Sequence, residues 1–264
     1  MTRLDALRTH WRTTLDSRDV DVLLADHLGR TTAWIFGHGD HELDAAAVEP
    51  VLRRRAAGEP LQYIRGRADF FGREFFVDPR VLIPRPETEL LVEAALARAA
   101  QGARVVDIGT GSGCIAVTME RERPDLHVVA VDRSPAALAV AKRNNDALGA
   151  NVRFAGSDLL DGLNATFDLI VSNPPYIPAA DVETLDAVVR DHEPRMALTP
   201  GPRGTEIIER ILAGARRAPV LLEIGYGQEA DVRAVAAAHG YVVETVIPDL
   251  AAIPRVVVLS AHGD

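Results

Sequence analysis

The chain has 264 residues, of which 47% are hydrophobic and 25% charged, proportions that are ordinary for a globular protein. Its net charge of −9 argues against broad attraction to nucleic acid, which needs a basic face. The single cysteine, Cys114, excludes an internal disulfide, the polar first residues do not resemble a signal peptide, and no apolar run approaches the roughly 18 residues of a membrane-spanning helix. We therefore expect a cytoplasmic protein that needs neither a membrane nor nucleic acid.

Residues 1–61 are predicted to form a small helical bundle, because apolar residues recur there at helical spacing. Asp19 is a candidate cap for the second helix, and a third helix is expected over residues 44–57. Trp11 and Trp34 are expected in the core, since buried aromatic side chains usually pack. A bundle of this size has little core of its own, so we expect it to rely on the next domain or on a partner.

Residues 62–82 change to a strand-like pattern, which predicts a β-hairpin that links two domains. Its apolar runs are Gln62-Tyr63-Ile64, Phe70-Phe71 and Glu74-Phe75-Phe76-Val77. The helix that follows begins near Glu87 and Thr88. Two prolines hold Arg85 and Glu87 in place before it, so this segment either caps the helix or lines a substrate pocket.

Residues 83–264 alternate strands with helices. Strands are expected over 104–108, 127–131, 152–155, 167–171, 220–224, 241–247 and 255–259, and helices over 114–121, 136–148, 204–217 and 228–239. This alternation predicts an α/β fold with a mostly parallel, Rossmann-like sheet and helices on both faces. The short loop between the last two strands predicts an antiparallel pair at one edge.

A glycine-rich loop joins the first strand of that sheet to its helix. It reads Asp107-Ile108-Gly109-Thr110-Gly111-Ser112-Gly113. Glycines let a ligand approach the backbone closely, and an acidic residue at the end of the next strand, Asp132, can bind ribose hydroxyls. The pattern G-x-G-x-x-A from Gly111 to Ala116 also fits a dinucleotide. Asp107 suits a cation better than a pyrophosphate, and Asp158 and Leu159 stand where adenine contacts are expected, so S-adenosylmethionine is favoured.

The segment Asn173-Pro174-Pro175-Tyr176 follows a buried strand, at the edge of the sheet where α/β proteins bind ligands. Neither proline has an N–H group, so the turn offers carbonyl acceptors and few donors. Asn173 adds a side-chain carbonyl and an NH2 group, and Tyr176 adds a flat aromatic face. Two fixed acceptors beside an aromatic ring suit a planar NH2 group, such as that of a carboxamide or an aminopurine.

Over nearly its whole length the sequence resembles the release factor glutamine methyltransferase family. The resemblance rests on residues 58–64, 82–89, 107–116, 131–132, 172–178, 193–194, 197–198, 223–225 and Gln228. The Asn-Pro-Pro-Tyr motif alone also occurs in adenine methyltransferases, and its combination with Pro-Arg-Pro-Glu-Thr-Glu is much more specific. Residues 201–205 depart from the glycine-rich run that is usual in the family.

The resemblance implies N5-methylation of the glutamine in the Gly-Gly-Gln motif of peptide chain release factors, with S-adenosyl-L-methionine converted to S-adenosyl-L-homocysteine. It implies a helical domain over residues 1–61 that helps to recognise the release factor, a hairpin over 62–82 and a class I methyltransferase domain over 83–264. We expect Asn173 and the Pro174 carbonyl to hold the substrate amide, with Tyr176 packed over it and Pro175, Arg85 and Glu87 beside it. Asn173 also borders the expected cofactor site. We expect a monomer.

Three other interpretations remain at this point. An adenine-N6 methyltransferase would present the same NH2 group, a non-catalytic module would bind nucleotide without turnover, and an oxidoreductase would bind a dinucleotide. No metal is expected, because His38 and His41 have no further ligands near them in the sequence.

Overall fold

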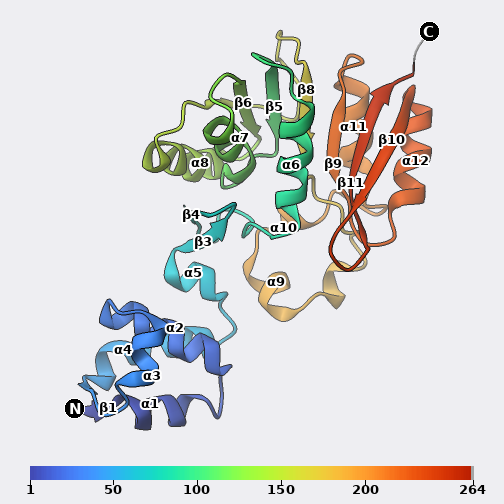
Figure 1. Ribbon diagram of the computed structural model, residues 1–264. Coiled ribbons are helices and arrows are strands. Elements are labelled where there is room, and N and C mark those ends of the chain that lie inside the picture. Colours follow the sequence, from blue (N-terminus) through green and yellow to red (C-terminus); the bar gives the residue numbers. More distant parts are fainter. Residues whose placement is uncertain (263–264) are drawn as a thin grey trace. The chain divides into compact units, whose positions relative to one another are not determined.

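The polypeptide divides into two units, each with a hydrophobic core of its own (Figure 1). A computed structural model describes residues 1–262. Unit 1 consists of Met1–Arg67 and Asp186–His192, and unit 2 of Ala68–Leu185 and Glu193–Asp264.

Unit 1 is helical. Its elements are α1 Leu4–Trp11, α2 Ser17–Leu28, α3 Thr32–Gly37, α4 Ala45–Ala56, α5 Leu61–Arg65 and α9 Ala187–His192, with a two-residue antiparallel pair of β1 Thr2–Arg3 and β2 Glu42–Leu43. The side chain of Asp16, and not that of Asp19, caps α2 by accepting from the Arg18 amide. Asp19 lies in the first turn and pairs with Arg55.

The strand predicted over residues 62–64 is wrong, because these residues form α5. Pro60 is the residue before this short helix, and Gly66 ends it in a left-handed conformation with φ of 67°. A proline before the first turn and a left-handed glycine after the last turn are helix boundaries, and they outweigh the weak strand propensity of Tyr63 and Ile64.

The core of unit 1 is aliphatic, and its tryptophans lie at the edge. The buried apolar residues are Leu4, Leu7, Val20, Leu23, Leu24, Ala25, Ile35, Leu43, Val48 and Leu52. Trp11 and Trp34 are only partly buried against this core. His38 stacks on Trp34 with ring centroids 4.1 Å apart, and His41 meets the same ring edge-on. Among residues 1–262 no cluster of three or more side chains could hold a metal ion.

A buried ion-pair cluster joins α1 to α2. The Asp21 carboxylate, whose residue is 4% exposed, lies 2.7 Å from Arg8 Nε and 2.6 Å from the Arg12 guanidinium. We expect Asp21→Ala to lower the free energy of unfolding by about 3 kcal/mol, because it leaves the Arg8 charge buried without its partner. Urea unfolding followed by tryptophan fluorescence measures this, since both tryptophans lie in unit 1. The exposed Asp40→Ala is the control, and equal stability of the two variants would contradict the assignment.

The described part of unit 2 contains a seven-stranded sheet. In spatial order its strands are β10 Tyr241–Pro248, β11 Pro254–Ala261, β9 Val220–Glu223, β8 Leu169–Ser172, β5 Arg104–Ile108, β6 His127–Asp132 and β7 Arg153–Gly156. The pairs from β9 to β7 are parallel, and β11 pairs antiparallel with both β9 and β10. The mostly parallel sheet with an antiparallel edge is therefore confirmed.

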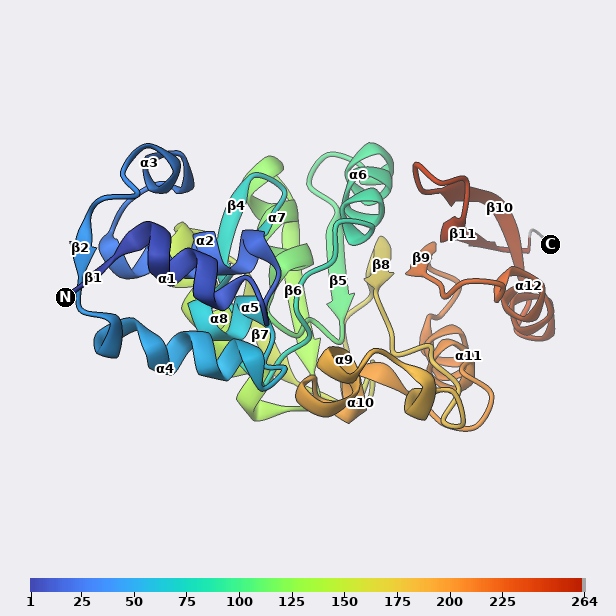
Figure 2. The same ribbon diagram turned by 90° about the horizontal axis from the view of Figure 1, so that it is seen from below.

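Helices cover both faces of this sheet. They are α6 Thr88–Arg98, α7 Cys114–Glu122, α8 Pro135–Leu148, α10 Arg195–Leu198, α11 Glu206–Gly214 and α12 Glu229–Ala238, with a 3-10 turn over Val182–Thr184. Figure 2 shows α6 and α7 on one face and α11 and α12 on the other. Two separate apolar clusters result, one under each helix layer. Because both faces are buried, the central strands are almost continuously apolar.

The hairpin is shorter than predicted. It comprises β3 Arg67–Phe70 and β4 Arg73–Phe76, turned by Phe71 and Gly72, which both have positive φ. Phe70 and Phe75 are buried in the same cluster as α6 and α7, and Asn144 of α8 bonds both backbone groups of Phe76. The hairpin is therefore tied to the core of the sheet.

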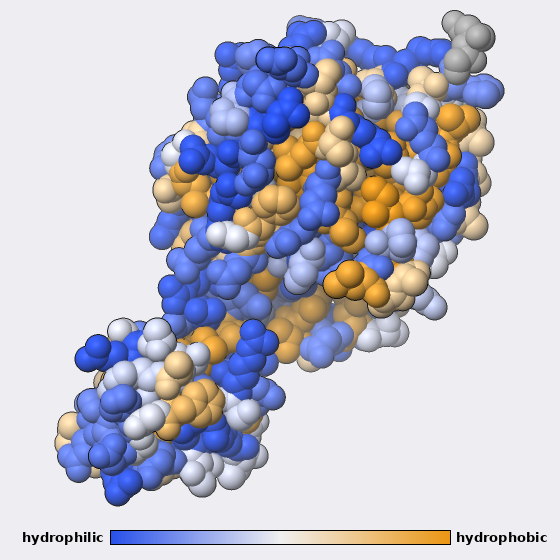
Figure 3. Space-filling view, in the orientation of Figure 1, coloured by the Kyte–Doolittle hydropathy of each residue, from blue (hydrophilic) through white to orange (hydrophobic). Residues whose placement is uncertain are grey.

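The surface of unit 2 is mixed, with apolar side chains gathered over β10 and β11 on the face seen in Figure 3. Val242 of the edge strand β10 is 40% exposed. None of the helices within residues 1–262 has both the length and the apolar character that crossing a bilayer requires.

Candidate functional site

The pairing of β5 with β8 brings two distant loops together. These parallel strands are in register, with Ile108 opposite Ser172. Each strand leaves the sheet at the next residue, β5 into the glycine-rich loop at Gly109 and β8 into Asn173. The Ser172 hydroxyl donates to the Ile108 carbonyl at 2.7 Å and fixes this junction.

A cavity of about 190 Å³ lies at this edge of the sheet. Its lining includes eight of the residues predicted from the sequence, namely Gly109, Gly111, Asp132, Asp158, Leu159, Asn173, Pro174 and Pro175. It also includes Leu82 and Pro194, which belong to the resembling segments but had no assigned role. Residues that the sequence analysis did not single out are Arg80, Val81, Arg133, Ser134, Met196, Thr199 and Ile207, among others. The expected cofactor loop and the expected substrate corner therefore share one cavity.

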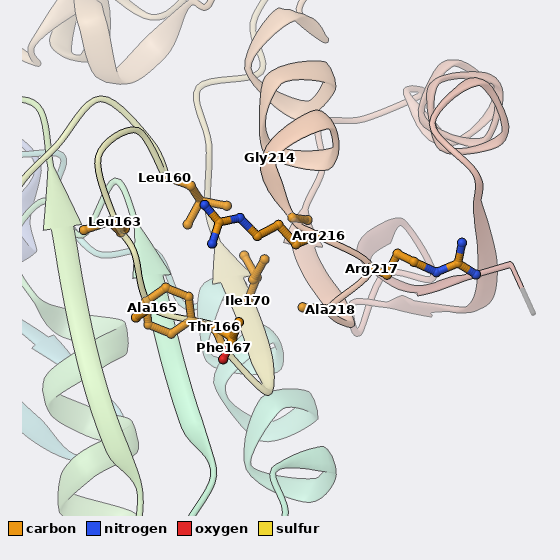
Figure 4. Close-up of a pocket in the computed structure, with 11 residues that line it drawn as sticks. Leu160, Leu163, Ala165, Thr166, Phe167, Ile170, Gly214, Arg216, Arg217 and Ala218 are labelled. Carbon is orange, nitrogen blue, oxygen red and sulfur yellow. The ribbon is translucent and has the colours of Figure 1, made fainter.

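A second cavity of similar volume lies toward the amino end of β8 (Figure 4). It is lined by apolar side chains such as Leu160, Phe167 and Ile170. The Arg216 side chain extends toward them, whereas that of Arg217 points away. None of the predicted site residues lines it. In open α/β sheets ligands bind at the carboxyl ends of strands, so the first cavity is the candidate site.

Asp132 fixes the backbone of the glycine-rich loop at the cavity. Its carboxylate accepts from the Gly111 amide at 3.0 Å and from the Ser134 amide at 2.8 Å. Gly109 has φ of +72°, and a Cβ placed there would meet no atom within 4 Å, so the backbone borders open space. A fixed carboxylate beside bare backbone fits a nucleoside with a ribose diol. Gly113 differs, because a Cβ there would lie 3.1 Å from that of Ala141, which shows tight helix packing.

Asp107, Thr110 and Ser112 are buried and are not among the residues that line the cavity. Asp107 is fully buried, and one of its oxygens accepts from the Thr110 hydroxyl at 2.6 Å. Its Oδ1 has no hydrogen-bond partner among the described residues. Burial, with a smaller contribution from the Asp132 charge, raises the pKa of Asp107 to about 7. Burial also raises the pKa of the neighbouring Cys114 thiol to about 12, which suits packing and not nucleophilic attack.

The raised pKa of Asp107 predicts how stability varies with pH. Because the folded-state pKa lies above the unfolded value, the neutral carboxyl is favoured in the folded protein, and stability is lost as pH rises toward 7 and the group must ionise. Asn cannot ionise, so the stability of Asp107→Asn relative to the wild type should be about 2 kcal/mol greater at pH 8 than at pH 5.5. Urea unfolding followed by circular dichroism at both pH values measures this. Any change in the free energy of unfolding that does not depend on pH cancels when the two pH values are compared. The prediction is contradicted if the difference between variant and wild type is the same at pH 5.5 and pH 8.

Arg85, Glu87 and Tyr176 are not among the residues that line the cavity. Arg85 forms an ion pair with Glu193, whose carboxyl pKa is raised by burial. Glu87 is the residue immediately before α6. The Tyr176 hydroxyl lies 3.5 Å from Glu223, and burial raises the pKa of this phenol.

Three residues that the sequence analysis did not assign to the site hold Tyr176 in place. Gln228 donates to the Tyr176 carbonyl at 2.6 Å and accepts from the Gly225 amide at 2.8 Å. A Cβ on Gly204 would lie only 2.5 Å from the same Tyr176 carbonyl oxygen. Gln228 and Gly225 belong to the resembling segments, but no local pattern indicates that they contact Tyr176. The atypical loop over residues 201–205 thus packs directly against the substrate corner.

Gly204 offers a test of this packing. Gly204→Ala should lower, about 10- to 100-fold, the rate of the methyl transfer that the resemblance implies, because the added Cβ must displace the Tyr176 carbonyl and with it the corner. Gly227→Ala is the matched control, since φ is +76° there against +81° at Gly204 and a Cβ would meet no atom within 4 Å. Rates measured with labelled S-adenosylmethionine compare the two variants. Equal rates in the two variants would contradict a role for the contact with Tyr176, because a positive φ is common to both positions.

Similarity to known proteins identifies the family of this chain. Residues 86–197 match the family described as "Methyltransferase small domain", and residues 8–66 match "PrmC N-terminal domain". The chain is 43% identical over 250 residues to the release factor glutamine methyltransferase of Koribacter versatilis, covering 90% of this chain and 89% of that protein. It is 45% identical over 260 residues to the protein of the same name from Burkholderia pseudomallei, covering 91% and 90%. The chain belongs to the release factor glutamine methyltransferase family.

The fold comparison is consistent with that membership. A Pyrococcus furiosus methyltransferase superposes with a TM-score of 0.55 at 18% identity, covering 74% of this chain and 91% of that one. A ribosomal protein L11 methylase from Lactobacillus delbrueckii gives 0.52 at 20% identity, covering 71% and 84%. These likenesses show the class I methyltransferase fold. The protein is a methyltransferase of this family with S-adenosylmethionine as its cofactor, and the resemblance stated from the sequence is confirmed.

Proposed function

We propose that this enzyme methylates the side-chain amide nitrogen, N5, of the glutamine in the Gly-Gly-Gln motif of peptide chain release factors. The observation that carries the proposal is a pair of unoccupied acceptors at the shared cavity. None of the described residues donates a hydrogen bond to Oδ1 of Asn173 or to the Pro174 carbonyl. Two acceptors can receive the two hydrogens of one carboxamide NH2 group.

The cofactor residues follow from the same cavity. We assign Asp132 to the ribose hydroxyls, the backbone at Gly109 and Gly111 to close approach of the cofactor, and Leu159 to the face of the adenine ring, because all four line the cavity. Asp158 forms an exposed ion pair with Arg210 at 2.9 Å, so its contact with the adenine amine requires exchange of that partner. Bound S-adenosylmethionine supplies an electrophilic methyl group on its sulfonium.

An amide nitrogen is a poor nucleophile, because its lone pair is delocalised into the carbonyl. With one hydrogen on Asn173 Oδ1 and the other on the Pro174 carbonyl, the nitrogen is held and its lone pair is directed toward the methyl group. The chain's contribution is therefore first one of proximity and orientation. The same two oxygens stabilise the positive charge that develops on the nitrogen, and the acidified N–H then loses its proton to water.

The remaining assignments are also proposals. We assign recognition of the release factor to unit 1, which contains the segment that matches the PrmC N-terminal domain. Contacts of Tyr176, Pro175, Arg85 and Glu87 with the substrate, a monomeric state and a cytoplasmic location stay predictions. The arginines at 53–55 all pair with carboxylates of unit 1, which argues against an unpaired basic patch for nucleic acid at this place.

Mass spectrometry tests the substrate directly. Purified release factor is incubated with the enzyme and labelled S-adenosylmethionine, and total RNA and DNA are incubated in parallel. One added methyl group on the glutamine of the Gly-Gly-Gln peptide, with fragments that place it on the side-chain nitrogen, supports the proposal. Label in nucleic acid with an unmodified release factor would instead support the adenine-methylating alternative.

Asn173→Ala tests the mechanism. It removes one of the two acceptors, so kcat should fall about 100- to 1,000-fold, the size seen when one preorganised hydrogen-bond partner is lost. The Kd for S-adenosylmethionine, measured by calorimetry, should change much less, because the cofactor's main contacts lie on the loop and Asp132. Asn164→Ala, at an exposed asparagine of the same unit, is the control. Turnover at the wild-type rate in Asn173→Ala would remove Asn173 from the mechanism.

A further inference from the structure

We propose that Thr88 is a positioning residue for the methyl transfer, which holds the Asn173 carboxamide so that its oxygen faces the substrate. The inference deepens the proposed function and rests on it. Thr88 is the first residue of α6, and its partner Glu223 is the last residue of β9. Neither residue lines the cavity, so Thr88 acts through Asn173 and Glu223 acts on Asn173 through Thr88.

A chain of hydrogen bonds connects the three side chains. The Thr88 hydroxyl donates to Glu223 Oε2 at 2.6 Å, and Asn173 Nδ2 donates to Thr88 Oγ1 at 3.1 Å. Thr88 and Glu223 are each 2% exposed, so water does not compete freely for these groups. The residues are far apart in the sequence and meet because α6 packs on β8 and β9.

The number of available hydrogens fixes which group donates in each of these two hydrogen bonds. A hydroxyl has one hydrogen, and Thr88 gives it to a carboxylate, which can only accept. The lone pairs of Thr88 therefore face Asn173, which must present its NH2 group there and not its oxygen. A flipped carboxamide would place two acceptor oxygens against each other. The Asn173 oxygen is thus left for the substrate, where the NH2 group would instead repel the substrate's own N–H donors.

Charged and titratable groups from the neighbouring elements influence the pKa of Glu223. Arg255 of β11 favours its ionised form, whereas Glu87 before α6 disfavours it, and Tyr176 after β8 and Cys114 of α7 are its other titratable neighbours. Burial is the largest influence and raises the pKa of Glu223 to about 7. A protonated Glu223 can donate to Thr88 and release the Thr88 hydrogen toward Asn173, which removes the preference for one orientation. The positioning is therefore complete only when Glu223 is ionised.

Two substitutions of matched shape test the proposal. Thr88→Val keeps the volume and removes the hydroxyl, whereas Thr88→Ser keeps the hydroxyl and removes a methyl group. We expect kcat on the release factor to fall at least about tenfold in Thr88→Val, with KM and the Kd for S-adenosylmethionine close to those of the wild type. The melting temperature should fall by a few degrees, because Glu223 and Asn173 lose a buried hydrogen-bond partner. Thr88→Ser should restore kcat to within about threefold of the wild type, since the hydrogen-bond chain is intact.

The double variant Thr88→Val with Asn173→Ala separates positioning from other roles. If Thr88 acts through Asn173, Thr88→Val has no further effect once the Asn173 side chain is gone, so the two losses do not multiply. Multiplied losses, a wild-type kcat in Thr88→Val, or a Thr88→Ser variant as slow as Thr88→Val would each overturn the proposal. Failure of the proposed function looks different, because the wild-type enzyme itself then leaves the release factor unmethylated.

Discussion

The parallel pairing of β5 with β8 is the interaction on which the site depends. Its register places Ile108 beside Ser172, so the loop after each strand begins at the same level of the sheet. The strands are held there by burial on both faces, with Val105, Val106, Ile170 and Val171 nearly free of solvent contact. A shift of one residue would separate Asn173 from the glycine-rich loop and force the β8 side chains to repack against both helix layers.

The proposed substrate corner, residues 173–176, has few hydrogen-bond donors of its own and is held by contacts from other segments. Its two prolines supply no N–H groups, so its oxygens are not satisfied from within the turn. The backbone is instead held from outside, by Gln228 on the Tyr176 carbonyl and by the close approach of Gly204 to the same oxygen. Under the proposed function, a substrate with matching donors would satisfy these acceptors, which explains why the fold leaves them without partners.

Two buried acids near the site have raised pKa values for the same physical reason. Asp107 accepts a hydrogen bond from the Thr110 hydroxyl of the cofactor loop, and Glu223 accepts one from the Thr88 hydroxyl next to the substrate corner. In both, burial is the largest influence on the pKa and raises it to about 7. Acids of raised pKa cluster at functional sites, where the polar network that they anchor fixes neighbouring groups at some cost in stability.

The sequence alone determined what depends on neighbours along the chain. The alternation of apolar strands and helices indicated the sheet, and the glycine-rich loop and the Asn-Pro-Pro-Tyr corner were recognisable because their chemistry lies within a few consecutive residues. Local pattern failed at residues 62–64, where Pro60 and Gly66 define a short helix, and at the cap of α2. Only the tertiary structure decided the contacts that cross the fold, such as Thr88 with Glu223, 135 positions apart, and Asn173 with Thr88, 85 positions apart. Periodicity carries no information about such pairs, because they arise from which strands are neighbours in the sheet and which helix packs across them.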